Sequence, residues 1–198
     1  MADATGYAIL PAIPADGRGR HENAGDPKDG AARLPPEDAD DLYAYARDPA
    51  VGPAAGWRPH GSLEESRDIL RMFLREDDVW AMELRATGRV VGSIGLHQDT
   101  FRRNNRCRSL GYVLARPHWG AGLMGEAVPA VLGFAFGEME LALVSVCHYP
   151  TNDRSRRVIE RAGFRYEGTL RQAVRLFDGT LQDHVCYSLT REEWAQCR

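Results

Sequence analysis

A strand that leads through a glycine-bearing loop directly into a helix is the feature that most constrains this chain. Residues 109–115 form an apolar strand pattern, Gly120, Gly122 and Gly125 follow, and a strongly apolar helix is expected over 123–136. Glycine lets backbone amides approach a ligand with no Cβ in the way. A helix N-terminus adds unpaired N–H groups and the positive end of a dipole. This run therefore predicts an anion site suited to phosphate.

The spacing Gly120-x-Gly122-x-x-Gly125 also matches the dinucleotide fingerprint. In a Rossmann unit, however, the strand runs straight into the first glycine, and an acid follows about 20 residues on, at the end of the second strand. Here residues 116–119 separate strand from glycine, and the next strand ends near Cys147 with no acid in place. The two misfits argue against nicotinamide binding. The remaining alternative to a phosphate site is that these glycines serve only to turn the chain.

Composition excludes several further classes of protein and of chemistry. The chain has 198 residues, a formal net charge of -3 and four scattered cysteines. Its length fits one domain, and its mild acidity argues against nucleic acid as a partner. Lys28 is the only lysine, so the main body has no residue for a Walker-type phosphate lysine or a Schiff base. With no metal-ligand cluster, signal pattern or long apolar run, we expect a cytoplasmic protein with free thiols, no metal and no membrane association.

Two regions differ in pattern. Residues 1–33 read as an N-terminal arm that holds a short first strand near Tyr7–Leu10 and a flexible insertion, and residues 34–198 read as the globular domain. In that domain, helices are expected to open near residues 35 and 62 and to cover 123–136 and 153–162, with a loop over 48–61. Strands are expected over 79–84, 89–96, 109–115, 143–147, 164–170 and 185–189. This order predicts a mixed α/β sheet with helices packed on it.

Several motifs, taken together in their order along the chain, resemble those of a known family. They are Glu37–Asp40, Val91–Gly95, Trp119–Ala127, Asn152–Arg157 with Ala162–Gly168, and Tyr187–Thr190. Together they resemble the GCN5-related N-acetyltransferase superfamily, in the branch of the ribosomal-protein N-terminal acetyltransferases. The resemblance covers Leu34 to Trp194. It implies an α/β (α+β) fold with a mixed, mostly antiparallel central sheet flanked by helices, splayed between the strands at 109–115 and 143–147.

The resemblance also implies a reaction. Acetyl-CoA would be the cosubstrate, and its acetyl group would move to a primary amine by direct attack in a ternary complex. The acceptor would be a small-molecule amine or a protein N-terminus, and a homodimer stays open. The alternative is a CoA-binding regulatory or interaction domain of the same fold without catalysis. Both hypotheses imply CoA binding, but only the first implies catalysis.

The cofactor residues come from the same resemblance. Backbone amides of the glycine loop would hold the pyrophosphate, and the strand before it would pair with the pantetheine arm. Pro117 departs from the Gln or Arg common at the start of this motif, which puts one phosphate contact in doubt. The implied set is Val113, Leu114, Ala115, Trp119, Gly120, Ala121, Gly122, Leu123, Met124, Gly125, Asn152 and Arg156.

The catalytic residues are less fully specified. The resemblance implies that Ser155 donates a proton or a hydrogen bond to the leaving thiolate. The glutamate base of the branch has no counterpart here, because residues 171–175 contain no acid. Histidine is a common general base, and His97, at the end of a central strand, is the base we predict. His148, Glu83 and Asp183 are the other candidates, and a nucleophilic Cys147 is the mechanistic variant.

Overall fold

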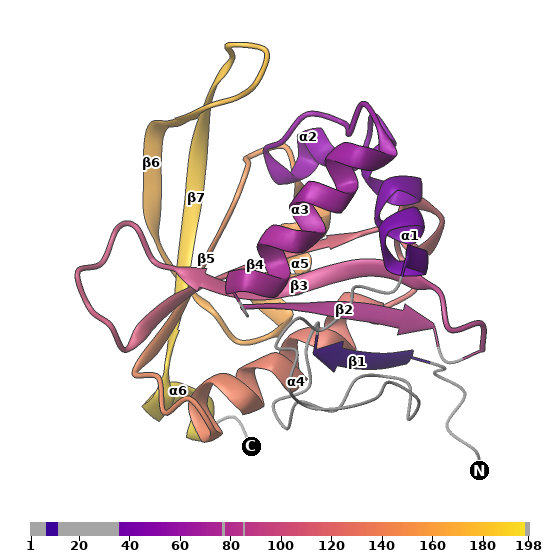
Figure 1. The fold of residues 1–198 in the computed structure, drawn as a ribbon. Helices are drawn as coiled ribbons and strands as arrows, with labels where there is room; N and C mark the ends of the chain where they lie inside the picture. The colour runs from indigo at the N-terminus through magenta and orange to yellow at the C-terminus, as the bar shows by residue number, and fades with distance from the viewer. Residues whose placement is uncertain (1–6, 12–35, 77, 85, 197–198) are drawn as a thin grey trace.

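The computed structural model describes residues 7–11, 36–76, 78–84 and 86–196. In these ranges a seven-stranded sheet has the order β1-β2-β3-β4-β5-β7-β6 (Figure 1). Its strands are β1 (Tyr7–Pro11), β2 (Val79–Leu84), β3 (Val90–Gln98), β4 (Cys107–Leu114), β5 (Leu143–His148), β6 (Arg165–Arg175) and β7 (Leu181–Thr190). The helices are α1 (Pro36–Ala46), α2 (Gly52–Ala55), α3 (Leu63–Glu76), α4 (Leu123–Gly137), α5 (Asp153–Arg161) and α6 (Arg191–Gln196), with a 3-10 turn at Arg116–His118.

The sheet opens between two of its central strands. Every neighbouring pair is antiparallel except β4 and β5, which are parallel. These two strands pair only from Cys107 to Ser109 on one side and from Leu143 to Ser145 on the other. β4 continues to Leu114 and β5 to His148 without pairing with each other, although each stays paired with its outer neighbour. The predicted mixed sheet and its splay are therefore confirmed.

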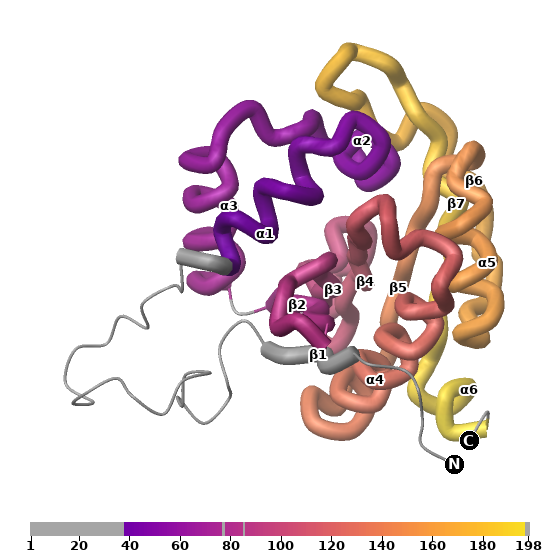
Figure 2. Tube along the Cα trace, turned by 90° about the vertical axis from the view of Figure 1, so that its right-hand side faces the viewer, coloured from indigo at the N-terminus to yellow at the C-terminus, as the bar shows by residue number. Residues whose placement is uncertain are grey.

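Helices cover both faces of the sheet. α1 and α3 lie on one side of the strands, and α4 and α5 lie on the other (Figure 2). The larger apolar cluster joins the α4 face to the sheet and includes Ile94, Phe136 and Val144. A smaller apolar cluster around Leu42 and Val90 packs α1 against the sheet. Burying each large apolar side chain contributes about 1.5–3 kcal/mol, so these clusters hold the splayed strands in place.

Several segments differ from the sequence-based expectation, among them α6, which was not expected. The loop expected over 48–61 contains the short helix α2, which a Trp57 N–H to Gly52 carbonyl bond of 3.1 Å closes. β6 and β7 are longer than expected and form a hairpin that extends past the rest of the sheet (Figure 1). Most of the added residues are polar, and each is exposed or only partly buried, so their strand pairing has no alternating apolar signal. Apart from β1, the expected arm 1–33 lies outside the described residues.

No helix in the described ranges is long and apolar enough to span a membrane.

Candidate active site

The glycine loop before α4 is shaped around open space. Gly120 and Gly122 have φ values of 81° and 85°, a conformation that L side chains rarely adopt. A Cβ added at Gly120, Gly122 or Gly125 would meet no atom within 4 Å. Gly122 is the N-cap of α4, and no side chain among the described residues caps this helix start. The loop thus has the open, uncapped geometry that an anion cradle requires.

A cavity of about 240 Å³ lies along this loop, and we call it the glycine-loop cavity. The Trp119 indole N–H donates to the Leu114 carbonyl at 2.7 Å, which fastens the loop to β4. The Arg154 guanidinium lies 4.5 Å from the centre of the Trp119 ring. Arg157 and Arg161 from the same helix also line the cavity. Backbone amides, cations and one aromatic ring suit a phosphorylated ligand such as CoA.

Most residues predicted for the cofactor line this cavity. They are Val113, Leu114, Trp119, Gly120, Gly122, Leu123, Met124, Gly125 and Asn152. Ala121 and Ala115 are not in its lining, and the Ala115 N–H donates to the Val91 carbonyl at 2.7 Å. Arg156 is also outside the lining and pairs with Asp153 and Glu160. Helical spacing explains the difference, because positions 154, 157 and 161 share one face of α5 and position 156 does not.

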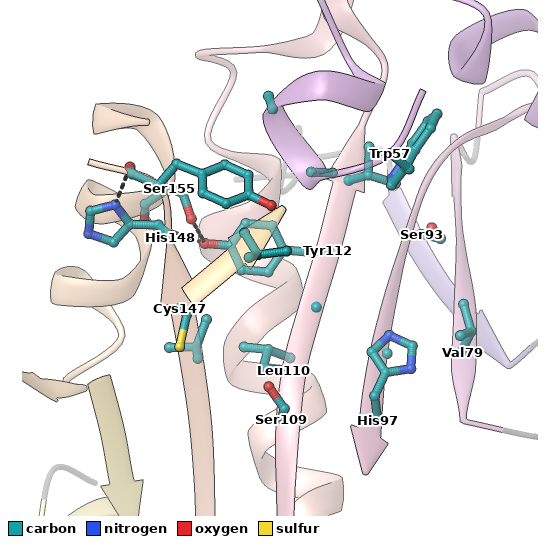
Figure 3. A pocket seen from close by; sticks show the side chains of 18 of the residues that line it. Trp57, Val79, Ser93, His97, Ser109, Leu110, Tyr112, Cys147, His148 and Ser155 are labelled. Atoms are coloured by element: carbon teal, nitrogen blue, oxygen red, sulfur yellow. Dashed lines mark hydrogen bonds between the residues drawn. The ribbon is translucent and has the colours of Figure 1, made fainter. Parts of the chain in front are cut away.

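A pair of hydroxyls lies where the glycine-loop cavity ends. Tyr112 Oη and Ser155 Oγ are 2.7 Å apart (Figure 3). Burial raises the pKa of Tyr112 to about 12, although the hydrogen bond with Ser155 opposes the shift. Asn152 orients this end of α5, because its Oδ1 accepts from the Ser155 N–H at 3.1 Å and its amide donates to the Ala54 carbonyl at 3.3 Å. Tyr112 was not predicted, since nothing in a strand tyrosine signals a partner 43 residues away.

A second cavity of about 920 Å³ lies towards α1 and α3, and four histidines line it, so we call it the histidine cavity. Its walls come from α1, α2, α3, α5, β2, β3, β4, β5 and the β6–β7 hairpin. The two cavities meet where the strands splay. The residues that line both are Ala54, Ala55, Tyr112, Val113, Asn152 and Ser155.

The histidine cavity carries little net charge. Among its described lining residues, Arg58 and Glu65 are the only ones with a fixed charge, and they pair at 2.8 Å. Burial lowers the pKa of His60 and of His184, so both rings are neutral near pH 7. No group of three acidic, histidine or cysteine residues in the described ranges is placed to hold a metal ion.

His97 lines the histidine cavity from β3. Its Nδ1 lies 3.0 Å from Asp78 Oδ2. His148 lines the same cavity, but its Nδ1 lies 2.8 Å from the carbonyl of Tyr149. Of the other two base candidates, Asp183 accepts the Gln172 N–H at 2.7 Å, and Glu83 lies on β2 outside the cavity lining. His97 is thus the candidate whose ring is both cavity-lining and paired with a carboxylate.

Cys147 also lines the histidine cavity, opposite Cys186 in the β5–β7 register. The two sulfurs are 3.1 Å apart, and both residues are free cysteines. Burial, reinforced by Cys186, raises the pKa of the Cys147 thiol well above its usual range. A thiolate nucleophile is therefore disfavoured at this position.

The sheet is thus splayed between two parallel strands, and the glycine-loop cavity and the histidine cavity share residues beside this gap. A family model described as "Acetyltransferase (GNAT) domain" matches residues 32–165. The chain therefore belongs to the GNAT acetyltransferase family, and it is an N-acetyltransferase.

Individual relatives agree with this assignment. The chain is 28% identical over 164 residues to "Uncharacterized N-acetyltransferase p20" of Bacillus licheniformis, covering 80% of this chain and 90% of that protein. It is 33% identical over 89 residues to the "[Ribosomal protein uS5]-alanine N-acetyltransferase" of Escherichia coli, with 45% of each chain covered. The predicted family and branch are thereby confirmed.

Solved structures share the fold. A GNAT-family acetyltransferase from Bacillus anthracis superposes with a TM-score of 0.72 at 22% identity, covering 80% of this chain and 92% of that one. "Mycobacterium smegmatis RimJ in complex with CoA-disulfide" superposes with a TM-score of 0.67 at 24% identity, covering 81% and 80%. At these identities the likeness establishes the fold alone.

Proposed function

We propose that this protein transfers the acetyl group of acetyl-CoA to a primary amine by direct attack in a ternary complex. The observation that carries this proposal is the meeting of the two cavities at six shared residues beside the splayed strands. Two ligands that enter from opposite cavities would come into contact there. Acetyl-CoA, held by the glycine loop and the α5 arginines, would supply the activated acetyl group.

The proton donor of this reaction is the hydroxyl pair. Tyr112 stays protonated at neutral pH because burial raises its pKa to about 12. Ser155 lies 2.7 Å from it and lines both cavities. This pair would hold a proton at the junction and donate it, through Ser155, to the departing thiolate.

The proton acceptor is His97. An amine is protonated near pH 7, so it must lose a proton before or during attack. His97 lies in the histidine cavity, and its ring packs against β4 at Gly111, the residue before Tyr112. In the family branch the base is a glutamate, and the matching residues of this chain, 171–175, contain no carboxylate. We therefore assign the base to His97.

The acceptor class follows from the charge of the histidine cavity. Its single carboxylate among the described lining residues, Glu65, is already paired with Arg58. A polyamine or an aminoglycoside would bring several cations into this space without carboxylates to balance them. Six aromatic side chains, Tyr45, Trp57, Phe73, Phe101, Tyr112 and Tyr149, line it instead. The proposed acceptor carries one amine on an otherwise uncharged body, such as a peptide N-terminus or a small alkylamine that bears an aromatic ring.

An acceptor screen tests this proposal. Purified protein, acetyl-CoA and matched sets of peptides, monoamines and polyamines would be assayed for free thiol release, with mass spectrometry of the products. We expect acetylated monoamines or peptides and poor turnover of spermidine. Calorimetric acetyl-CoA binding with no product from any amine would favour a CoA-binding domain without catalysis. Absence of CoA binding would contradict both readings.

A further inference from the structure

The His97 ring lies in a position prepared by its neighbours. A Cβ at Gly111 would lie 3.1 Å from His97 Nε2 and Cδ2, and a Cβ at Gly95 would lie 3.1 Å from His97 Cε1. β3 and β4 pair Gly95 directly with Gly111, so the two glycines form one bare patch under the ring. Such contacts are tighter than ordinary van der Waals packing. Side chains at either glycine would displace the ring, so its placement depends on this patch.

Asp78 closes the other side of the ring. Its backbone carbonyl accepts the Leu96 N–H at 2.8 Å, which anchors the residue to β3 just before His97. Its Oδ2 lies 3.0 Å from His97 Nδ1. Oδ1 of Asp78 is buried and finds no hydrogen-bond partner among the described residues, so His97 is the one side-chain donor to this carboxylate in those ranges.

This contact decides which ring nitrogen carries the proton. An ionised carboxylate only accepts hydrogen bonds, so Nδ1 must donate its hydrogen to Asp78. In a neutral imidazole the other nitrogen, Nε2, then has a free lone pair. Nε2 lies over Gly111, which precedes Tyr112 in β4, and the ring lines the histidine cavity.

We propose that Asp78 is the positioning residue of this site: it holds His97 in the Nδ1–H tautomer and keeps the Nε2 lone pair available for the proton of the acceptor amine. This inference rests on the proposed function of His97 as the base. Asp78 itself touches neither substrate in this scheme. Its carboxylate also stabilises the imidazolium that forms when Nε2 takes the proton, because opposite charges at hydrogen-bond distance attract.

Three variants and one spectroscopic readout test it. Nitrogen-15 NMR of histidine-labelled protein distinguishes protonated from unprotonated ring nitrogens, and His97→Gln assigns the His97 signals. We expect Nδ1–H with bare Nε2 in the unsubstituted protein. In Asp78→Asn the side-chain amide donates to Nδ1 and leaves the hydrogen on Nε2, so kcat should fall roughly 10²-fold with little change in KM for acetyl-CoA. Asp78→Glu keeps a carboxylate and should restore the tautomer and part of kcat.

The control is Asp68→Asn, which removes an exposed carboxylate of α3 that pairs with Arg71. It should leave the His97 signals and kcat in place. A predominant Nε2–H tautomer in the unsubstituted protein, or an Asp78→Asn variant with normal kcat, would overturn the inference even if acetyl transfer is observed. Failure of every amine to be acetylated would count against the proposed function, while the tautomer would still be measured. If Asp78→Asn does not fold, the tautomer of the unsubstituted protein and the Asp78→Glu variant decide the question.

Discussion

The glycine-loop cavity and the histidine cavity adjoin each other but are assembled differently. The first consists largely of one continuous run, Leu114 to Gly125, and of one face of α5. The second is lined by residues from ten separate helices and strands, from Leu42 on α1 to His184 on β7. Under the proposed function, the ligand common to the family would be held by a local loop, whereas the acceptor would be chosen by side chains that only the fold brings together.

The largest effect is expected from the histidine cavity. His97→Gln removes the proposed base and should lower kcat about 10³-fold, because general base catalysis contributes about 10²–10⁴-fold. KM for acetyl-CoA should change little, since His97 is outside the glycine-loop cavity. Steady-state kinetics at saturating acetyl-CoA measure this. His184→Gln, at another histidine of the same cavity, is the comparison and should act mainly on the acceptor's KM; equal kcat losses in both variants would contradict the assignment.

The second-largest effect is expected from the Tyr112–Ser155 hydroxyl pair, where the two cavities meet. Ser155→Ala and Tyr112→Phe each remove one hydroxyl of the pair and should lower kcat about 10- to 100-fold, with Ser155→Ala the more severe. The control is Tyr166→Phe, which removes an exposed hydroxyl that bonds Thr169. Wild-type turnover in Ser155→Ala would contradict the proposed acid.

The same tyrosine predicts a pH dependence. The pKa of Tyr112 is raised to about 12, so its hydroxyl stays protonated and the turnover number should show no loss from this group between pH 8 and pH 10. Because the pKa of Tyr112 is higher in the folded state than in the unfolded state, protonation of Tyr112 adds to the free energy of unfolding. This stabilisation is complete below the unfolded pKa of about 10 and is lost as the pH rises towards 12. Denaturant unfolding across this range should therefore show a smaller alkaline loss of stability for Tyr112→Phe than for the unsubstituted protein.

A smaller effect is expected from the glycine loop. Gly120→Ala places a methyl group in the open cradle and should raise KM for acetyl-CoA about tenfold, equivalent to roughly 1.4 kcal/mol. Gly179→Ala is a matched control, because Gly179 also has positive φ, 87°, and equally open surroundings, but lies in the β6–β7 turn. Both variants should lose about 1–2 kcal/mol of stability from backbone strain. Equal KM values would show that the loop does not hold the cofactor.

The smallest effect is expected at Cys147. Cys147→Ala should change kcat less than about twofold, because its thiol pKa is raised and direct transfer needs no acyl-enzyme. Intact-mass measurement of protein mixed with acetyl-CoA alone should show no acetylated thiol. An acetyl adduct lost in Cys147→Ala would instead establish the covalent variant.

The sequence alone determined the features that short-range patterns encode. Gly120, Gly122 and the following helix predicted the anion cradle, and Asn152 predicted the cap of α5, because turns and caps depend on neighbouring residues. The order of strands and helices, with the family motifs, was enough for the mixed sheet and its splay. Even here, Arg156 and Arg157 could not be separated by motif and were separated only by the face of α5 that meets the cavity.

Tertiary structure decided the contacts across long separations. Tyr112 meets Ser155 only because β4 and β5 diverge, and Asp78 meets His97 only because β2 lies beside β3. Neither pair leaves a periodic or compositional signal, since each contact depends on strand register and on the direction of single side chains. The sequence therefore predicted a place for a phosphorylated cofactor. The fold determined which two hydroxyls lie where the two cavities meet and which carboxylate pairs with His97 in the histidine cavity.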